Sequence, residues 1–513
     1  MQISMPFVRA SRRHGHHRNA RNVSISLLDD PNGVSASVLL LSGAVFACGL
    51  IFGGGEGSFG DVVAQLLALP LIVLAALQWS TARLRASDWL ALAVIVGIVV
   101  LACIELMPLS LPAWAALPGR AELLAQMQAA KVVPAWTSIS LNPLGTERAL
   151  LWTLPAIAMF LAVRWMSPRQ QKVLVLALFV GGVLMTIMDV VFRTANDNGD
   201  VTAASLLAKA YQDDAGIQTA TRAPISDTAM TGLFSNHNHF GTFLAMTIPL
   251  MVAMGLGLWL DRKRGKGRGA AAAMTLLALG AVSLLAAAFE THSRAALLLG
   301  SLALVGSGAM LADLGLPRRT LWSIAGASVL MVVIAGITAG ATGLDRLGNG
   351  IDNDLRWQIH GTTLDAAHHF GTMGAGLGTF VEAYQAVPPQ EGMLPAFVNR
   401  AHGDYHELWL ETGIPGAILI VAFIVWFGWS SLRAWLLTPA DAADADPRHG
   451  RERLFARAAS LSIGLLLIHS YVEYPLHKTA ILVVFGLCCG LLARGPEKAA
   501  ATEAPAAVSS ANA

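Results

Sequence analysis

Charged residues are scarce in this chain. Only 13% of its 513 residues are Asp, Glu, Lys or Arg, and 55% are hydrophobic. A soluble globular domain carries about 25% charged residues. A deficit of this size over the whole sequence argues against a soluble protein and predicts that most of the chain lies in lipid. Because lipid leaves backbone groups no partner outside their own segment, we predict an all-helical class.

Cysteine is also rare. The four cysteines are Cys48, Cys103, Cys488 and Cys489, and all lie within apolar runs. No pair has the spacing of a disulfide framework or of a CxxC metal site. We therefore expect packed thiols that bind no metal. We also expect no cofactor.

The N-terminus lacks the layout of a cleavable signal peptide. It is basic and His-rich as far as Asn22, and the first apolar run begins only near Val38. We expect residues 1–36 to form a cytoplasmic tail before a retained span, its basic side chains lying near anionic lipid rather than binding a metal.

Long apolar runs dominate the remaining sequence. A span needs about 20 apolar residues, and about twelve candidates are present. They cover residues 37–53, 61–79, 88–107, 147–163, 173–192, 239–260, 271–289, 294–313, 320–342, 415–437, 455–470 and 479–493. Spans one to nine then occupy residues 37–343 and spans ten to twelve residues 415–494. We expect residues 495–513, rich in Ala, Pro and Ser, to form a disordered cytoplasmic tail.

The Lys and Arg residues between the spans predict an orientation. Every second loop is short and basic, beginning with Arg83 and Arg85. The loops between these are nearly free of Lys and Arg, or long. This positive-inside pattern places both termini in the cytoplasm. The exported loops are then 108–146, 193–238 and 344–414, and the last is long enough to carry short helices.

Three arginines fall on the predicted outer face, where topology gives no reason for positive charge. They are Arg294, Arg356 and Arg400. Arginine grips phosphate through two parallel hydrogen bonds, so these residues indicate a lipid phosphate as ligand. The alternative is that Arg294 snorkels to the interface and Arg356 pairs with Asp352 or Asp354.

The segment from His402 to Gly413 has a helical pattern, and we expect Gly413 to end this helix and Pro415 to open the next span. His402, His406 and Trp409 share one face, and Glu407 and Glu411 share another. A neutral histidine can take a proton from a hydroxyl near pH 7, although an interfacial helix whose histidines only form hydrogen bonds has the same pattern. A zinc protease is excluded because its second histidine would stand at Leu410.

Further polar side chains occur at the outer ends of predicted spans. They are costly there unless they bind a ligand or one another. They comprise Asn236, Asn238 and His239 before the sixth span, and His469 and Glu473 after the eleventh. Gly374, Gly376 and Gly378 do not match a dinucleotide loop, and we expect them to form a turn.

Four of these segments together resemble the O-antigen ligase superfamily, which also includes O-antigen and exopolysaccharide polymerases. Arg400–Gly416 is similar to its His segment, Phe234–Phe240 to its Asn-x-Asn segment, and Ser293-Arg294 and Arg356-Trp357 to its two Arg segments. The resemblance covers roughly residues 230–480. Two positions depart from the family pattern, Gly403 in place of Asn and Ala417 in place of Gly, Thr or Tyr.

The resemblance implies a GT-C-like fold and a metal-independent, inverting glycosyl transfer in the bacterial inner membrane. The donor would be a glycan on undecaprenyl pyrophosphate, and the acceptor a sugar hydroxyl on lipid A–core or on a growing polysaccharide, with no nucleic acid involved. The catalytic residues would be Arg294, Arg356 and His402. The substrate-binding residues would be Arg400, Asn236, Asn238, His239, Tyr405, Glu411, His469 and Glu473.

A transporter or flippase of a lipid-linked or polar substrate is the alternative function. It would hold ionisable residues near the middle of its spans. In this sequence they gather at one surface instead, with Asp189, late in the fifth predicted span, as an exception.

Overall fold

The computed structural model describes residues 36–54, 59–79, 84–195, 229–263, 265, 269–311, 319, 326, 330, 355–388, 397–437 and 447–494. Within these residues it contains helices and no strand. The ninth predicted span lies outside them apart from isolated positions, as do the predicted tails and most of the 193–238 loop.

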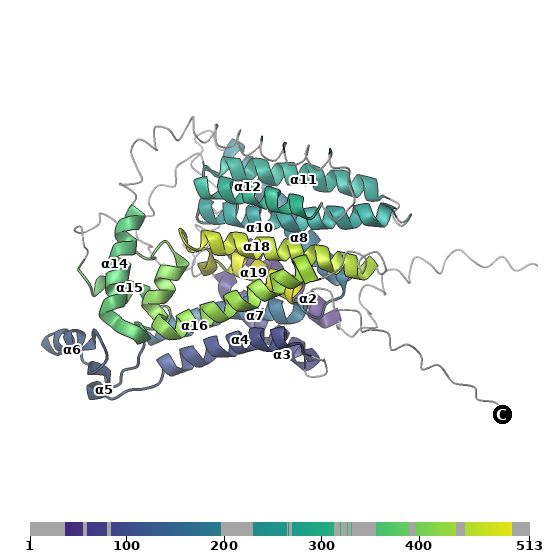
Figure 1. Cartoon of the computed structure of the whole chain (residues 1–513). Helices are drawn as coiled ribbons and strands as arrows, with labels where there is room; N and C mark the ends of the chain where they lie inside the picture. Colours follow the sequence, from purple (N-terminus) through teal and green to yellow (C-terminus); the bar gives the residue numbers. More distant parts are fainter. Residues whose placement is uncertain are drawn as a thin grey trace, which may run out of the picture.

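The described residues form a bundle of long helices, labelled in Figure 1. The bundle helices are α2 (Ala36–Phe52), α3 (Phe59–Trp79), α4 (Ala86–Glu105), α7 (Pro143–Val163), α8 (Pro168–Ala195), α10 (His237–Lys263), α11 (Ala270–Glu290), α12 (Arg294–Ala309), α16 (Asp404–Leu432), α18 (Pro447–His469) and α19 (Thr479–Arg494). A π-helical turn, η3 (Arg433–Leu437), continues α16.

Hydropathy explains why these segments form helices that lie in lipid. Among the described residues, seven helices are long and apolar enough to cross a membrane: α3, α4, α7, α8, α10, α11 and α16. Three shorter apolar helices, α2, α12 and α19, join them. The chain is thus a polytopic integral membrane protein, and each predicted span outside residues 320–342 coincides with a helix.

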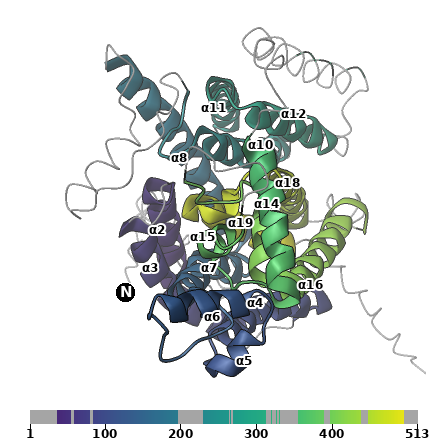
Figure 2. The same ribbon diagram turned by 90° about the vertical axis from the view of Figure 1, so that its left-hand side faces the viewer.

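The centre of the bundle is formed by α7, α10, α18 and α19. The most enclosed helix is α19, where nearly every side chain from Thr479 to Ala493 is buried. Figure 2 shows α19 surrounded by α7, α10 and α18, with α2 and α3 on one side and α11 and α12 on another. Three cysteines are packed in the interior as predicted, but Cys103 is exposed because it lies on the outward face of α4.

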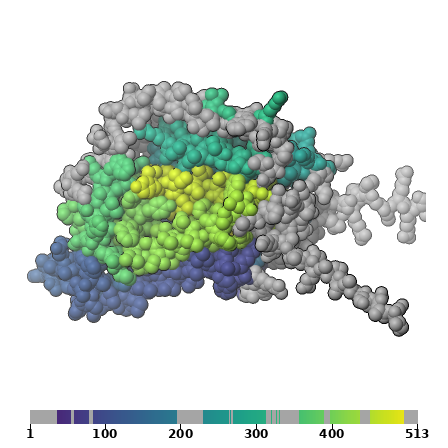
Figure 3. All heavy atoms as spheres, in the orientation of Figure 1, coloured from purple at the N-terminus to yellow at the C-terminus, as the bar shows by residue number. Residues whose placement is uncertain are grey.

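One end of the bundle carries a set of short helices that we call the cap. It consists of α5 (Leu111–Ala115), α6 (Arg120–Ala129), α14 (Leu355–Phe370), η2 (Gly371–Met373) and α15 (Phe380–Gln385). Figure 3 shows the cap in blue and green against the ends of the bundle helices. The long loop before α16 therefore does contain short helices.

The glycine-rich turn joins the cap to the bundle. Gly374, Gly376 and Gly378 have φ angles of 75°, 109° and 75°, which only glycine adopts readily. The amide of Gly376 donates to the carbonyl of Glu411 at 2.7 Å, and the amide of Leu377 donates to the Glu105 carboxylate at 2.8 Å. The predicted turn is confirmed, and it holds three distant parts of the chain together.

Arg120, an arginine that the sequence reasoning did not consider, holds the same turn. It is 1% exposed, and its guanidinium donates to the carbonyls of Pro118, Ile139 and Gly374 at 2.8–3.0 Å. Burial lowers the pKa of Arg120 to about 10. An arginine at the capped end can therefore serve structure alone.

Gly413 marks the junction between the first turns of α16 and its membrane span. Its φ and ψ of 51° and −139° interrupt the helix before Pro415, as the sequence predicts. A Cβ atom added at Gly413 would lie 2.2 Å from the carbonyl oxygen of Thr372 in the cap. The junction requires glycine both for its backbone conformation and for this close approach.

The Gly413→Ala variant is expected to lose about 2 kcal/mol or more of unfolding free energy, because strain and overlap with Thr372 add. Thermal unfolding in detergent measures the loss. Gly428→Ala is the matched control, since a Cβ at Gly428 on the same helix meets no atom within 4 Å. Equal stability of the two variants would contradict the prediction.

Candidate functional site

The start of α10 positions one wall of the site. The Asn236 side chain accepts the backbone N–H of Asn238 at 2.8 Å, and its carbonyl accepts the N–H groups of His239 and Phe240. Asn236 thus serves as a helix cap, which satisfies donors that a helix start leaves open. This capping directs the Asn238 side chain and the buried His239 ring toward the link between α18 and α19.

Glu473, in that link, is the residue around which the site is arranged. Its Oε1 accepts Arg356 Nη2 at 2.5 Å and Asn238 Nδ2 at 2.9 Å. Its Oε2 lies 3.6 Å from His239 Nε2 and 3.7 Å from His402 Nδ1. Residues from α10, α14, the segment before α16 and the α18–α19 link therefore meet at one carboxylate, and we call this group the Glu473 centre.

The groups around Glu473 determine the protonation state of its carboxylate. Glu473 is 1% exposed, and burial would raise its pKa. The adjacent His239 and His402 rings and the charge of Arg356 outweigh burial, so the pKa of Glu473 lies well below its usual range. The carboxylate is therefore ionised and can hold a cation and an imidazole in fixed positions.

The backbone at His402 departs from the sequence prediction. The helix begins at Asp404, and His402 has a φ of 52°, so the prediction that His402 and His406 share a helical face is wrong. The reason is a tertiary contact. The extended Gly403 leads to Asp404, whose N–H donates to the carbonyl of Glu473 at 3.2 Å. This conformation directs His402 toward Glu473.

The environment of His402 leaves part of its ring accessible. Its side chain is 28% exposed, and its ring centroid lies 5.2 Å from that of Tyr474. His406 lies elsewhere, stacked on His360 with centroids 4.1 Å apart. A Cβ at Gly403 would lie 2.7 Å from His406 Nδ1, which explains why a larger residue does not fit at this position here.

His469 lies beneath the Glu473 centre. It is 1% exposed, and its Nδ1 is 2.5 Å from Thr242 Oγ1 on α10. His469 therefore contacts protein, and its position supports the packing of α18 against α10.

A second group of charges occupies the other side of the segment before α16. Arg400 Nη1 lies 2.9 Å from Glu407 Oε1, and His477 contacts both Glu407 at 3.0 Å and Asp404 at 3.2 Å. Burial and the charge of Arg400 would lower the pKa of His477, but the two carboxylates raise it to about 9. Arg400 thus pairs with Glu407 rather than with the Glu473 centre.

Two predicted substrate-binding residues contact the protein backbone. The Tyr405 hydroxyl donates to the carbonyl of Leu467 at 2.9 Å. The buried Glu411 carboxylate accepts the N–H of Phe380 at 3.0 Å, which fixes the start of α15. Both residues still line a cavity of about 680 Å³, together with Arg400 and His477.

Arg294 is not among the residues that contact Glu473. It is exposed and begins α12, directly after Ser293, whose hydroxyl accepts the N–H of Ala296 at 3.1 Å. No ion pair joins Arg294 to any residue that the structure describes. Close packing of Gly241 against Ala296 holds this end of α12 against the start of α10.

Sequence reasoning missed Lys478 and Tyr474. Lys478 is fully buried, 3.4 Å from Ser235 Oγ and 5.6 Å from the centre of the Tyr474 ring. Lys478 also lies on the predicted outer face, where topology gives no reason for positive charge. The reasoning that pointed to the three arginines therefore applies to Lys478 as well. Within the described parts of the chain, no group of three or more His, Cys, Asp or Glu side chains is arranged to hold a metal ion.

Fold and site together define a polytopic helical membrane protein with a buried carboxylate that joins arginine and histidine under a cap. Residues 279–421 match the family model described as O-antigen ligase. The match confirms the resemblance to the O-antigen ligase superfamily seen in the motifs. A comparison with curated proteins finds no match. The matched segment contains Arg294, Arg356 and His402, whereas Asn238 and Glu473 lie outside it.

Proposed function

We propose that the protein transfers a glycan from undecaprenyl pyrophosphate to a sugar hydroxyl at the periplasmic face of the bacterial inner membrane. Its termini would lie in the cytoplasm, and the acceptor would be lipid A–core or a growing polysaccharide. The observation that carries the proposal is the Glu473 centre, where one carboxylate lies against both Arg356 and His402. The family match supports a ligase or polymerase type of function in general.

The reaction proceeds by a single displacement. His402 takes the proton of the acceptor hydroxyl as its oxygen attacks the anomeric carbon from the face opposite the pyrophosphate. The bond from that carbon to the pyrophosphate oxygen breaks, and undecaprenyl pyrophosphate leaves with the electron pair. Inversion at the anomeric carbon follows from this geometry.

The leaving group requires neutralisation of charge rather than a proton. Arg356 is 34% exposed beyond its contact with Glu473, so its guanidinium can face a phosphate. Arg294, exposed at the start of α12, adds a second positive charge. Cations placed where negative charge develops lower the barrier most in a site from which water is excluded.

Arg294→Ala and Arg356→Ala are each expected to reduce transfer by about 10²-fold or more, because each removes a cation that acts on the leaving pyrophosphate. Purified protein incubated with lipid-linked repeat units, with and without lipid A–core, measures this. Ladder growth without core would identify a polymerase, and a single transfer to core a ligase.

Arg451→Ala is the control for these variants, because Arg451 pairs with Asp261 at 3.1 Å, at the end of α10 opposite Asn238 and the Glu473 centre. If Arg294→Ala or Arg356→Ala transfers glycan at the rate of the unmodified protein, that arginine has no role in the mechanism. Loss of activity on treatment with EDTA would contradict the metal-independent reaction.

A further inference from the structure

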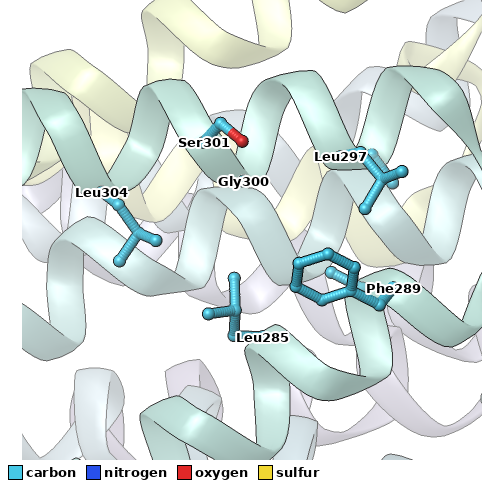
Figure 4. A pocket seen from close by; sticks show the side chains of 8 residues that line it. Leu285, Phe289, Leu297, Gly300, Ser301 and Leu304 are labelled. Carbon is cyan, nitrogen blue, oxygen red and sulfur yellow. The ribbon is translucent and has the colours of Figure 1, made fainter. Parts of the chain in front are cut away.

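The small hollow near Arg294 cannot hold a group of the substrate. Figure 4 shows this hollow, which lies between α11 and α12. It is lined by Leu285, Phe289, Leu297 and Leu304, among others. Its volume of about 10 Å³ is about that of one water molecule, so no sugar or phosphate fits it. The surroundings of His402, the proposed base, are different, because polar groups meet its backbone there.

The backbone of His402 has an uncommon conformation. Its φ of 52° is in the left-handed region, and His402 is one of three non-glycine residues with positive φ in the part of the chain that the structure describes. Residues other than glycine are disfavoured in this region, and they keep the conformation only where their surroundings hold it. Neighbouring groups must therefore impose the conformation of the proposed base.

Two hydrogen bonds hold the residues on either side of His402. The N–H of Ala401 donates to Glu407 Oε2 at 2.9 Å, and the N–H of Asp404 donates to the carbonyl of Glu473 at 3.2 Å. These bonds fix the two ends of the segment. Neither of them involves the peptide groups of His402 itself.

His360, on α14, supplies a hydrogen bond to His402. Its Nε2 lies 3.1 Å from the carbonyl oxygen of His402. Because a carbonyl oxygen only accepts, Nε2 of His360 must carry the proton and donate it. His360 is buried, so water competes little for this bond. The bond acts on the residue whose backbone is in the uncommon conformation.

Helix α14 holds His360 in a fixed relation to Arg356. The two residues are four apart, so their side chains lie on one face of the helix. From that face Arg356 reaches Glu473, and His360 reaches the backbone of His402. The rings of Trp357 and His360 are nearly perpendicular, with centroids 5.8 Å apart, which limits the movement of the histidine. One helix thus positions both the cation and the base of the proposed reaction.

The residue after His402 leaves room for His360. Gly403 has a φ of −176°, which is extended backbone that any residue adopts. A Cβ atom at this position would, however, lie 2.7 Å from His406 Nδ1 and 3.3 Å from His360 Nε2. The glycine therefore keeps space for the hydrogen-bond donor, which accounts for the departure from the Asn of the family pattern.

We infer that His360 is a positioning residue for the proposed transfer. Its Nε2–H holds the carbonyl of His402, this bond stabilises the left-handed backbone, and that backbone directs the His402 ring to Glu473. The inference rests on the proposed function, since that function gives His402 the role of base. His360 acts on the reaction through His402 rather than on the substrate.

The His360→Phe variant tests the hydrogen bond. Phenylalanine keeps a ring against Trp357 but cannot donate, so kcat for transfer should fall about tenfold while KM for the lipid-linked donor changes little. His360→Gln should recover most of the rate, because the amide of glutamine can donate from a similar position. His368→Phe is the matched control, since the same substitution is then made at an exposed position of the same helix.

Hydrogen–deuterium exchange measured by mass spectrometry provides a readout that needs no activity. The amides of Ala401 and Asp404 should exchange about tenfold faster in His360→Phe than in the unmodified chain, because the segment opens more often when one of its bonds is lost. In His360→Gln and His368→Phe these amides should exchange nearly as slowly as in the unmodified chain.

Three results would overturn the inference. The first is unchanged exchange and unchanged kcat in His360→Phe. The second is an equal loss in His360→Phe and His360→Gln, which would show that the imidazole acts through its shape. The third is a lower kcat without faster exchange, which would show that the effect does not pass through the His402 segment.

Failure of this inference can be distinguished from failure of the proposed function. If the unmodified chain transfers no glycan but the segment opens faster in His360→Phe and not in His360→Gln, the proposed function fails and the hold of His360 on His402 stands. If His360→Phe transfers glycan at the normal rate, the positioning role is refuted and the transferase stands.

Discussion

The His402→Ala variant is expected to transfer glycan about 10²–10⁴-fold more slowly than the unmodified protein, the range that a general base contributes. The loss follows from geometry. Nδ1 of His402 lies 3.7 Å from the ionised Glu473 carboxylate, which orients the ring and leaves Nε2 for the acceptor hydroxyl. Since the side chain is 28% exposed, its removal should change the stability little.

A matched histidine control exists nearby on the same segment. His406 stacks on His360, and no described contact joins it to Glu473, so His406→Ala should retain most of the transfer activity. Initial rates with lipid-linked repeat units, compared at equal amounts of inserted protein, measure both variants. Normal transfer by His402→Ala would exclude His402 as the base, and equal losses in both variants would indicate a structural role instead.

The Glu473→Gln variant is expected to lose most of its transfer activity and about 3 kcal/mol of unfolding free energy. Removing one member of a buried ion pair costs about 3–5 kcal/mol, and the partial exposure of Arg356 favours the lower end. Glutamine retains the shape and can still accept from Asn238, but it cannot neutralise Arg356 or orient His402 by charge.

A double variant can distinguish a positioning role of Glu473 from a loss of activity that comes only from reduced stability. If Glu473 acts through Arg356, the double variant Glu473→Gln with Arg356→Gln should be scarcely slower than either single variant. Glu122→Gln, which changes an exposed carboxylate on α6 of the cap, is the control for loss of a carboxylate. Rates that multiply in the double variant would show that the two residues act independently.

The bundle could be predicted from the sequence because hydropathy and helix length are local properties. Each predicted span within the described residues is a helix, and even the break at Gly413 before Pro415 was predictable. The membrane orientation and the count of about twelve spans stay predictions, since the ninth lies outside the described residues.

The site could be predicted only as a set of residues, not as contacts. The predicted residues Arg356, His402, Asn238, His239 and Glu473 do gather at one point. Their pairing could not be predicted, because Asp352 and Asp354 are close to Arg356 in sequence whereas Glu473 is distant. Arg148, which lines the large cavity together with Arg400, was missed because it lies inside the predicted span 147–163 and not in a loop.

The position of Glu473 near the end of the chain has a consequence for biosynthesis. Ribosomes deliver the chain from its N-terminus, so Arg356 and His402 enter the membrane before α18 and Glu473 have been made. Until then the arginine and the histidine lack the carboxylate that aligns them. We therefore expect that a nascent chain which already contains residues 279–421 cannot yet carry out the proposed transfer, and that activity begins only when α18 and the link after it are in place.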